Sequence, residues 1–146
     1  MTDVFAWTFQ GGAIKSVPIP ATAGNVVYSL TPPAGKRYLV ILGRIVLVCD
    51  GNAANRTPQF GITDGTNLLL QLGSKTTAVT AGQTKSVGFS TRDNEGIQDW
   101  GAVENAECRI PANLFLDNGF DFDITVTAGL AGDSYSGFVL VLEIDI

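Results

Sequence analysis

Histidine is absent from this 146-residue chain. Without histidine, the chain cannot build a Ser-His-Asp or Cys-His nucleophilic site, and it lacks the commonest general base and zinc ligand. Cysteine is nearly absent as well, because the chain has only Cys49 and Cys108, which lie far apart and share no metal-ligand spacing. A disulfide between them is possible, but two buried free thiols are the interpretation we prefer. We therefore expect a protein that is not an enzyme and has no catalytic, cofactor or metal site.

Positive charge is also scarce, because 9 Lys and Arg residues stand against 14 Asp and Glu residues, which gives a net charge of −5. A nucleic-acid partner normally requires a basic face, so we expect none. The N-terminal residues Met1–Val4 are acidic where a secretory signal needs basic residues, and the apolar runs are too short to cross a membrane as a helix. We expect synthesis in a cytoplasm and no membrane partner.

Carboxylates are the remaining candidates for chemistry. Asp121 and Asp123 fall on one face of a predicted strand, about 7 Å apart at a rise of about 3.3 Å per residue, a pairing that glycoside hydrolysis could use. They alternate with apolar residues, which favours a solvated strand face over a catalytic pair. Asp117 and Asp133 would complete a set of oxygen ligands for calcium, but the spacing matches no calcium-loop motif. We predict neither site.

Strand and turn signals fill the chain, which has 17 Gly residues and no sustained apolar period of 3.6 residues. About eight strands are predicted, at 25–30, 37–49, 59–63, 68–72, 86–90, 107–110, 120–127 and 135–146. The third and fourth form a hairpin around Asp64-Gly-Thr66, and its inward residues are expected to be Phe60, Ile62, Leu68, Leu70 and Leu72. The clearest alternation, in 120–127, places Phe120, Phe122, Ile124 and Val126 inward.

This pattern predicts an all-β protein, an antiparallel β-sandwich. Jelly-roll topology is the form we prefer, because it places the first long core strand, 37–49, beside the last strand, 135–146. An immunoglobulin-like sandwich is the alternative, and it usually carries a core Trp between its two Cys positions. Trp100 does lie between Cys49 and Cys108, but in a charged loop at 92–104.

The central stretch 37–49 is apolar on both faces of the predicted strand. One set of alternate residues contains Leu39, Ile41, Ile45, Leu47 and Cys49, and the other contains Tyr38, Val40, Leu42, Val46 and Val48. A strand covered on one face only usually alternates apolar with polar residues, so we expect something beyond the domain's own core to cover the second face. We predict Tyr38, Val40, Leu42 and Arg44 as interface residues.

Two arginines need separate interpretations. Arg44 interrupts the apolar set that contains Tyr38 and Val40. Its guanidinium either reaches solvent or forms an inter-subunit salt bridge to Glu143 or Asp145. Arg56 lies in the loop that follows the central strand, and we expect it to fix that loop by donating hydrogen bonds.

Residues 1–20 are predicted to form an N-terminal arm, and 21–146 a single β-sandwich domain. Phe5, Trp7 and Phe9 alternate in an extended segment that is followed by glycines and by a Pro-rich joint at 17–20. Either this segment is the first strand of its own sandwich, or it is an arm laid on a neighbouring subunit; the sequence favours the two readings about equally. We add its three aromatic residues and Trp100 to the predicted interface.

Two stretches resemble a known class of proteins. The run Leu30-Thr-Pro-Pro-Ala-Gly-Lys-Arg-Tyr-Leu-Val-Ile-Leu42 and the run Asn55-Arg-Thr-Pro-Gln-Phe-Gly-Ile-Thr-Asp-Gly65 are similar to small β-sandwich proteins from the structural modules of tailed bacteriophages. In that pattern a Pro- and Gly-rich turn begins a long apolar strand, and a loop with an Asn-Arg pair leads into a strand that ends in Asp-Gly. The resemblance covers roughly residues 25–72 and carries no catalytic signature.

The resemblance implies a virion structural protein. The expected function is that of a decoration (cement) protein, which binds and stabilises the capsid surface through oligomer and arm contacts. Its partners would be further copies of itself, with a homotrimer favoured, and the major capsid protein; it would be made in the host cytoplasm and reside on the capsid. The alternative is a tail, baseplate or fibre component, or a receptor-binding jelly roll whose Trp100 or Tyr135 stacks on sugar rings. A jelly-roll enzyme is opposed by the absence of histidine.

Overall fold

The computed structural model describes residues 12–73, 78–90, 105–111 and 113–146. The strands in this part of the chain are β1 (Gly12–Ala23), β2 (Tyr28–Leu30), β3 (Lys36–Val48), β4 (Thr57–Thr63), β5 (Leu68–Gly73), β6 (Thr84–Ser90), β7 (Asn105–Arg109), β8 (Phe115–Leu116), β9 (Asp121–Thr127) and β10 (Ser134–Asp145). No helix within these ranges is long and apolar enough to cross a membrane.

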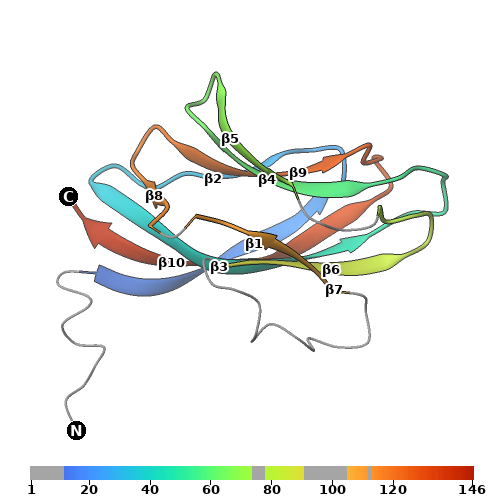
Figure 1. Cartoon of the computed structure of the whole chain (residues 1–146), viewed down its shortest axis with the longest axis horizontal. Coiled ribbons are helices and arrows are strands. Elements are labelled where there is room, and N and C mark those ends of the chain that lie inside the picture. The colour runs from blue at the N-terminus through green and yellow to red at the C-terminus, as the bar shows by residue number, and fades with distance from the viewer. Residues whose placement is uncertain (1–11, 74–77, 91–104, 112) are drawn as a thin grey trace, which may run out of the picture.

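The strands form two layers, which Figure 1 shows nearly edge-on. Sheet A has the order β1-β10-β3-β6-β7, with β8 also paired to β3, and sheet B has the order β2-β9-β4-β5. Neighbouring strands are antiparallel except β6 and β7, which run parallel. The predicted all-β antiparallel sandwich is therefore confirmed, as is the predicted placement of the central strand beside the last one.

Three phenylalanines join the two sheets. Phe60 and Phe122 come from sheet B and Phe89 from sheet A, and their ring centroids lie 4.6 Å apart for Phe60–Phe89 and 5.1 Å apart for Phe89–Phe122. All three side chains are at most 1% exposed. The alternation of β9 explains this arrangement, because every second residue of a strand points to the same face. Phe122, Ile124 and Val126 are buried, as predicted, but the predicted inward position of Phe120 was wrong, because Phe120 precedes the strand and is 40% exposed.

A β-bulge divides the central strand β3. Leu140 of β10 pairs with Leu42 and the next residue, Val141, pairs with Val40, so Ile41 is an extra residue. A bulge reverses which residues face the core. Tyr38 and Val40 therefore point inward at one end of β3, whereas the core residues beyond the bulge are Ile45, Leu47 and Cys49. The predicted division of β3 into two continuous sets was wrong, because strict alternation cannot anticipate the extra residue.

A second bulge corrects the predicted hairpin. The hairpin of β4 and β5 forms as predicted, but Ile62 pairs with Leu70 and Thr63 with Leu68, which leaves Leu69 as the extra residue. Leu70 packs against the core, whereas Leu68 is 56% exposed. The predicted inward position of Leu68 was therefore wrong, for the same physical reason as in β3.

The boundary of the predicted arm also needs correction. Residues 12–19 pair with β10 in continuous antiparallel register, so this part of the predicted arm belongs to sheet A. Proline is tolerated there because β1 is an edge strand and needs a hydrogen-bonded partner on one side only. The aromatic residues Phe5, Trp7 and Phe9 lie outside the described residues, as does Trp100.

Candidate functional site

The surface of sheet A that faces away from sheet B carries a row of apolar side chains. Ile14 of β1 pairs with Leu142 of β10, Leu142 with Leu39 of β3, and Leu39 with Phe115 of β8. Leu142 points away from the core because its neighbour Val141 points into it. We call these four residues the apolar row, and the surface that carries them the outer face of sheet A.

A second row beside the first extends the apolar surface. Leu140 of β10 pairs with Leu42 of β3, and both side chains are half-buried. At the two ends of the apolar row, Ile14 is 51% exposed and Phe115 is 47% exposed. The guanidinium of Arg37 lies 5.7 Å from the centre of the Phe115 ring, at cation–π distance. A continuous apolar strip thus crosses four strands of sheet A.

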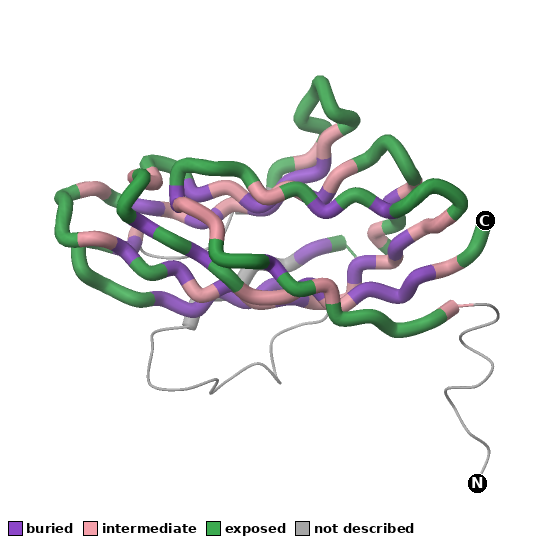
Figure 2. Tube along the Cα trace, turned by 180° about the vertical axis from the view of Figure 1, so that it is seen from behind, coloured by how far each residue is buried: buried purple, intermediate pink, exposed green. Residues whose placement is uncertain are grey.

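The corresponding surface of sheet B is polar. One row there runs from Ser29 through Asp123 and Gly61 to Gln71, across the strands β2, β9, β4 and β5. Gln71 donates a hydrogen bond to Gln59 on the adjacent strand. Figure 2 shows that the turn between β4 and β5 projects from this layer as an exposed hairpin. The row across sheet B is therefore polar where the row across sheet A is apolar, and the exposed apolar residues Leu68 and Leu69 of sheet B lie on its edge strand β5.

The acidic pair considered for catalysis lies on this polar face. Asp121 accepts a hydrogen bond from Thr31, and Asp123 accepts one of 3.4 Å from Thr63. Both carboxylates are half-buried and alternate with the core residues of β9. Within the described residues, no three His, Cys, Asp or Glu side chains form a group that could hold a metal ion. The pair lies on the outer face of sheet B, and Oδ1 of Asp123 is buried there.

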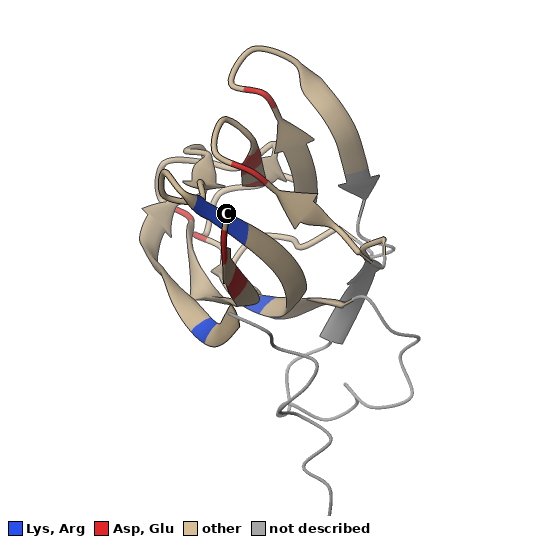
Figure 3. Ribbon diagram, turned by 90° about the vertical axis from the view of Figure 1, so that its left-hand side faces the viewer, with Lys and Arg blue, Asp and Glu red and all other residues tan. Residues whose placement is uncertain are grey.

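Ion pairs gather at the end of the sandwich where β3 begins and β10 ends. Lys15 lies 2.7 Å from Glu143, and Lys36 pairs with both Glu143 and Asp145. The hydrogen bond from Lys15 is the main reason that the pKa of Glu143 lies below its usual value. Figure 3 looks at this end, where acidic and basic segments adjoin near the C-terminus.

These pairs bear on the predicted role of Arg44. Its two predicted carboxylate partners, Glu143 and Asp145, already bind lysines of the same subunit. Arg44 lies on the outer face of sheet A, where its Nε donates a hydrogen bond of 2.5 Å to the hydroxyl of Ser86. An inter-subunit contact of Arg44 stays a prediction.

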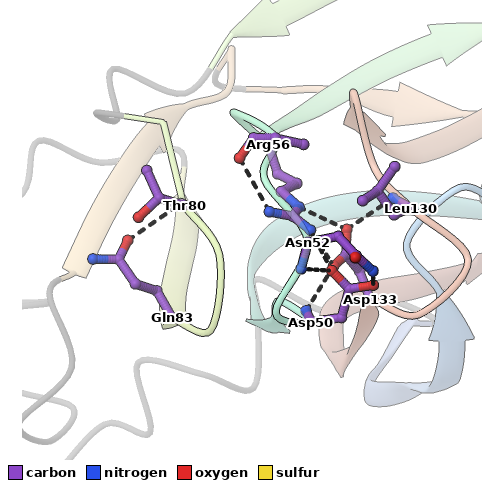
Figure 4. Close-up of polar contacts among 8 residues, drawn as sticks. Asp50, Asn52, Arg56, Thr80, Gln83, Leu130 and Asp133 are labelled. Atoms are coloured by element: carbon purple, nitrogen blue, oxygen red, sulfur yellow. Dashed lines mark hydrogen bonds and ion pairs between the residues drawn. The ribbon is translucent and has the colours of Figure 1, made fainter.

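A buried ion pair stabilises the opposite end of the sandwich (Figure 4). Arg56 donates from Nε to Oδ2 of Asp133 at 2.9 Å and from Nη2 to Oδ1 at 3.0 Å, and neither side chain is exposed. Its Nη2 also lies 2.6 Å from Asp50, and its Nη1 donates to the carbonyl of Ala54. The prediction that Arg56 fixes its loop is confirmed.

Asp133 is the acceptor at the centre of this cluster. Its carboxylate also accepts hydrogen bonds of 2.8 Å from the backbone amides of Asp50 and Leu130, and its own carbonyl accepts one from the amide of Gly24. Burial by itself raises the pKa of Asp133, but the hydrogen bonds from Arg56 and the two amides outweigh it and leave the pKa below its usual value. The cluster joins the loop that holds Asp50 and Arg56 to the loops that hold Asp133 and Gly24. We interpret it as structural.

The structure separates the predicted interface residues. Tyr38 and Val40 belong to the core, whereas Leu42 and Arg44 lie on the outer face of sheet A. The remaining four predicted residues fall outside the described part of the chain. Sequence reasoning missed all four members of the apolar row, namely Ile14, Leu39, Phe115 and Leu142. One signal was present, because residues 138–142 of β10 are apolar at every position, as β3 is over 38–42.

Comparisons with known proteins add no family: no protein-family model matches the chain, and a search of curated proteins found no match.

Proposed function

We propose that this chain is a virion structural protein of a tailed bacteriophage, and specifically a decoration protein that stabilises the capsid surface. The observation that carries the proposal is the apolar outer face of sheet A. A contiguous apolar patch on a small protein marks a surface that another protein covers. The resemblance of residues 25–72 to phage β-sandwich proteins supplies the setting.

The strand order supports this setting. Two four-stranded antiparallel arrays face each other, β1-β10-β3-β6 and β2-β9-β4-β5, and the first strand of the chain lies beside the last. We infer jelly-roll connectivity from this order, with β7 and β8 as additions to sheet A. Jelly rolls are common in viral capsid proteins and in lectins.

The proposed mode of action is binding rather than catalysis. The decoration protein would associate with copies of itself and with the major capsid protein. Closed cyclic symmetry is the usual outcome of self-association. A homotrimer is our preference, which the resemblance supports. Bound copies would stabilise the capsid by mass action, because a ligand that binds only the assembled shell favours that shell.

The polar outer face of sheet B favours a second candidate, a carbohydrate-binding component of the tail. Amide and carboxylate side chains such as Gln59, Gln71 and Asp121 are half-buried or exposed there. Among the described residues, Oδ1 of Asp123 has no hydrogen-bond partner, but this oxygen is buried, so a sugar hydroxyl could reach it only after neighbouring side chains move. Under this alternative the protein would lie at the tail tip.

Electron microscopy of virions labelled with an antibody to this protein tests the proposal. Label spread over the head is the expected result. Label confined to the tail tip supports the carbohydrate-binding alternative and overturns the decoration role. Virions that carry no label at all would overturn both candidates.

A further inference from the structure

We propose that the apolar row on the outer face of sheet A is a docking surface for residues Val4–Phe9 of a second copy of this chain. The inference rests on the self-association that is part of the proposed function. It identifies the two surfaces that meet.

The docking surface is defined by its contrast with the rest of the molecule. The apolar row spans four neighbouring strands, which is about 14 Å at a strand spacing of about 4.8 Å. The matching row of sheet B reads Ser29, Asp123, Gly61 and Gln71, so an apolar outer face is not a general feature of this sandwich. Among the described residues, the row across sheet A is apolar where the matching row of sheet B is polar, so covering its exposed ends Ile14 and Phe115 would add stability.

The first strand leaves room for Leu142, which lies against the backbone of Gly12 and is 6% exposed. A Cβ at position 12 would lie 2.9 Å from Cδ1 of Leu142, so a side chain at this position would crowd the row. The residue there is glycine. Gly12 is the first residue of β1 and the first residue that the structure describes.

The proposed ligand matches the row in chemistry and in length. Phe5, Trp7 and Phe9 alternate along Val4–Phe9, so in an extended segment the three rings share one side. Six extended residues measure about 20 Å, which exceeds the span of the row. Each aromatic side chain buries about 150–250 Å² when it is covered.

The connection to β1 favours a second copy over the same copy. Gly12 is paired with Ile144 as a regular strand residue, so only Gln10 and Gly11 separate Phe9 from the strand. Reversal over two residues produces a hairpin, which returns the chain beside β1 in the plane of the sheet. Covering the face of its own sheet would require a longer connection. The segment can instead continue away from its own subunit and bind the row of another.

A complementation experiment with full-length chains tests this arrangement. The face variant combines Ile14→Glu with Phe115→Glu, and the segment variant combines Phe5→Ser, Trp7→Ser and Phe9→Ser. Leu69→Glu is the matched control, because Leu69 is 52% exposed on sheet B and Ile14 is 51% exposed on sheet A. Sedimentation velocity gives the oligomeric state, and circular dichroism verifies that each variant keeps its β-fold.

We expect the unmodified chain and the Leu69 control to self-associate, and the face and segment variants to be monomers. A mixture of the two variants should form a heterodimer, because one chain retains the intact row and the other retains the intact segment. If the two Glu substitutions prevent folding, Ile14→Thr with Phe115→Thr replaces them.

Three results would overturn the inference: a monomeric unmodified chain, self-association that survives either set of substitutions, or a mixture that stays monomeric. Virion labelling is independent of these outcomes. Label on the head together with a monomeric protein leaves the proposed function and removes the docking inference. If the two variants complement each other but the head carries no label, the docking inference stands and the proposed decoration function is overturned.

Discussion

Replacement of Asp133 by alanine tests how the buried ion pair stabilises this sandwich. The substitution removes the acceptor of two hydrogen bonds from Arg56 and of the amide hydrogen bonds from Asp50 and Leu130. The guanidinium of Arg56 is fully buried and would keep only Asp50 and the Ala54 carbonyl as partners. An incompletely compensated charge would then remain inside the protein.

Removal of one partner from a buried ion pair costs about 3–5 kcal/mol. The whole free energy of unfolding of a domain is about 5–15 kcal/mol, so Asp133→Ala is expected to remove a large fraction of it. For a chain of this length each kcal/mol corresponds to roughly 3–4 °C in the melting temperature. We therefore expect the midpoint to fall by about 10–20 °C.

Thermal unfolding followed by circular dichroism at pH 7 provides the measurement. Asp145→Ala is the matched control, because Asp145 also pairs with a basic side chain, Lys36, but is 71% exposed. Exposed ion pairs contribute little, so the control should leave the midpoint nearly unchanged. If both variants melt within a few degrees of the unmodified chain, the structural role assigned to Asp133 is wrong.

The pH dependence supplies an independent check on the same group. The pKa of Asp133 is lower in the folded protein than its ordinary value near 4. A carboxylate with a depressed folded pKa contributes stability above its unfolded pKa, and this contribution disappears as the pH falls through the folded pKa. The stability difference between the unmodified chain and Asp133→Ala should therefore be full at pH 6–7 and should shrink below about pH 4. A difference that grows on acidification would contradict the assignment.

Two further predictions concern the interior of sheet A. A Cβ at Gly43 would lie 2.2 Å from Cζ of Phe89 and 2.7 Å from the Phe138 carbonyl oxygen. Gly43→Ala should therefore overpack the core and lower the free energy of unfolding by about 1–3 kcal/mol, which urea unfolding would measure. Gly51→Ala is its control, because a Cβ there has no atom within 4 Å, and equal losses in both variants would contradict the packing argument. Cys49 is a free thiol with 5% exposure, and burial raises its pKa. In a Cys108→Ser chain, a thiol reagent should therefore label it only after denaturation, and rapid labelling of the native protein would refute this expectation.

The strands that sequence reasoning predicted well are those with undisturbed alternation. In β9 the period of two residues runs without interruption from Asp121 to Thr127, and the predicted inward residues within it are buried, whereas Phe120, also predicted inward, precedes the strand and is 40% exposed. Arg56 was interpreted correctly because a lone arginine in a loop has few roles other than hydrogen-bond donation. Its partner Asp133 could not be predicted, because 77 residues separate the two in sequence and only the fold brings their loops together.

The errors share one physical origin, which is the inserted residue of a bulge. Ile41 and Leu69 each reverse the facing of the residues beyond them, and neither sequence position carries a glycine or proline that would signal the irregularity. The misplaced arm boundary has a different cause. Prolines argue against a central strand, but they are compatible with an edge strand, and the sequence does not state which strand lies at an edge.

A strand that is apolar on both faces predicts an interaction surface whichever of its residues face outward. The bulge moves Tyr38 and Val40 into the core, yet Leu39 takes their place on the outer face beside Leu42, which was predicted there. When a bulge exchanges the inward and outward residues of an apolar stretch, each face stays apolar, because both sets of residues are hydrophobic. A strand that is apolar on both faces therefore predicts a covered outer surface even where the residues assigned to that surface are wrong. The adjacent strand β10 carries the same pattern, with Leu140 and Leu142 outside and Val139 and Val141 inside, so two central strands present one apolar surface.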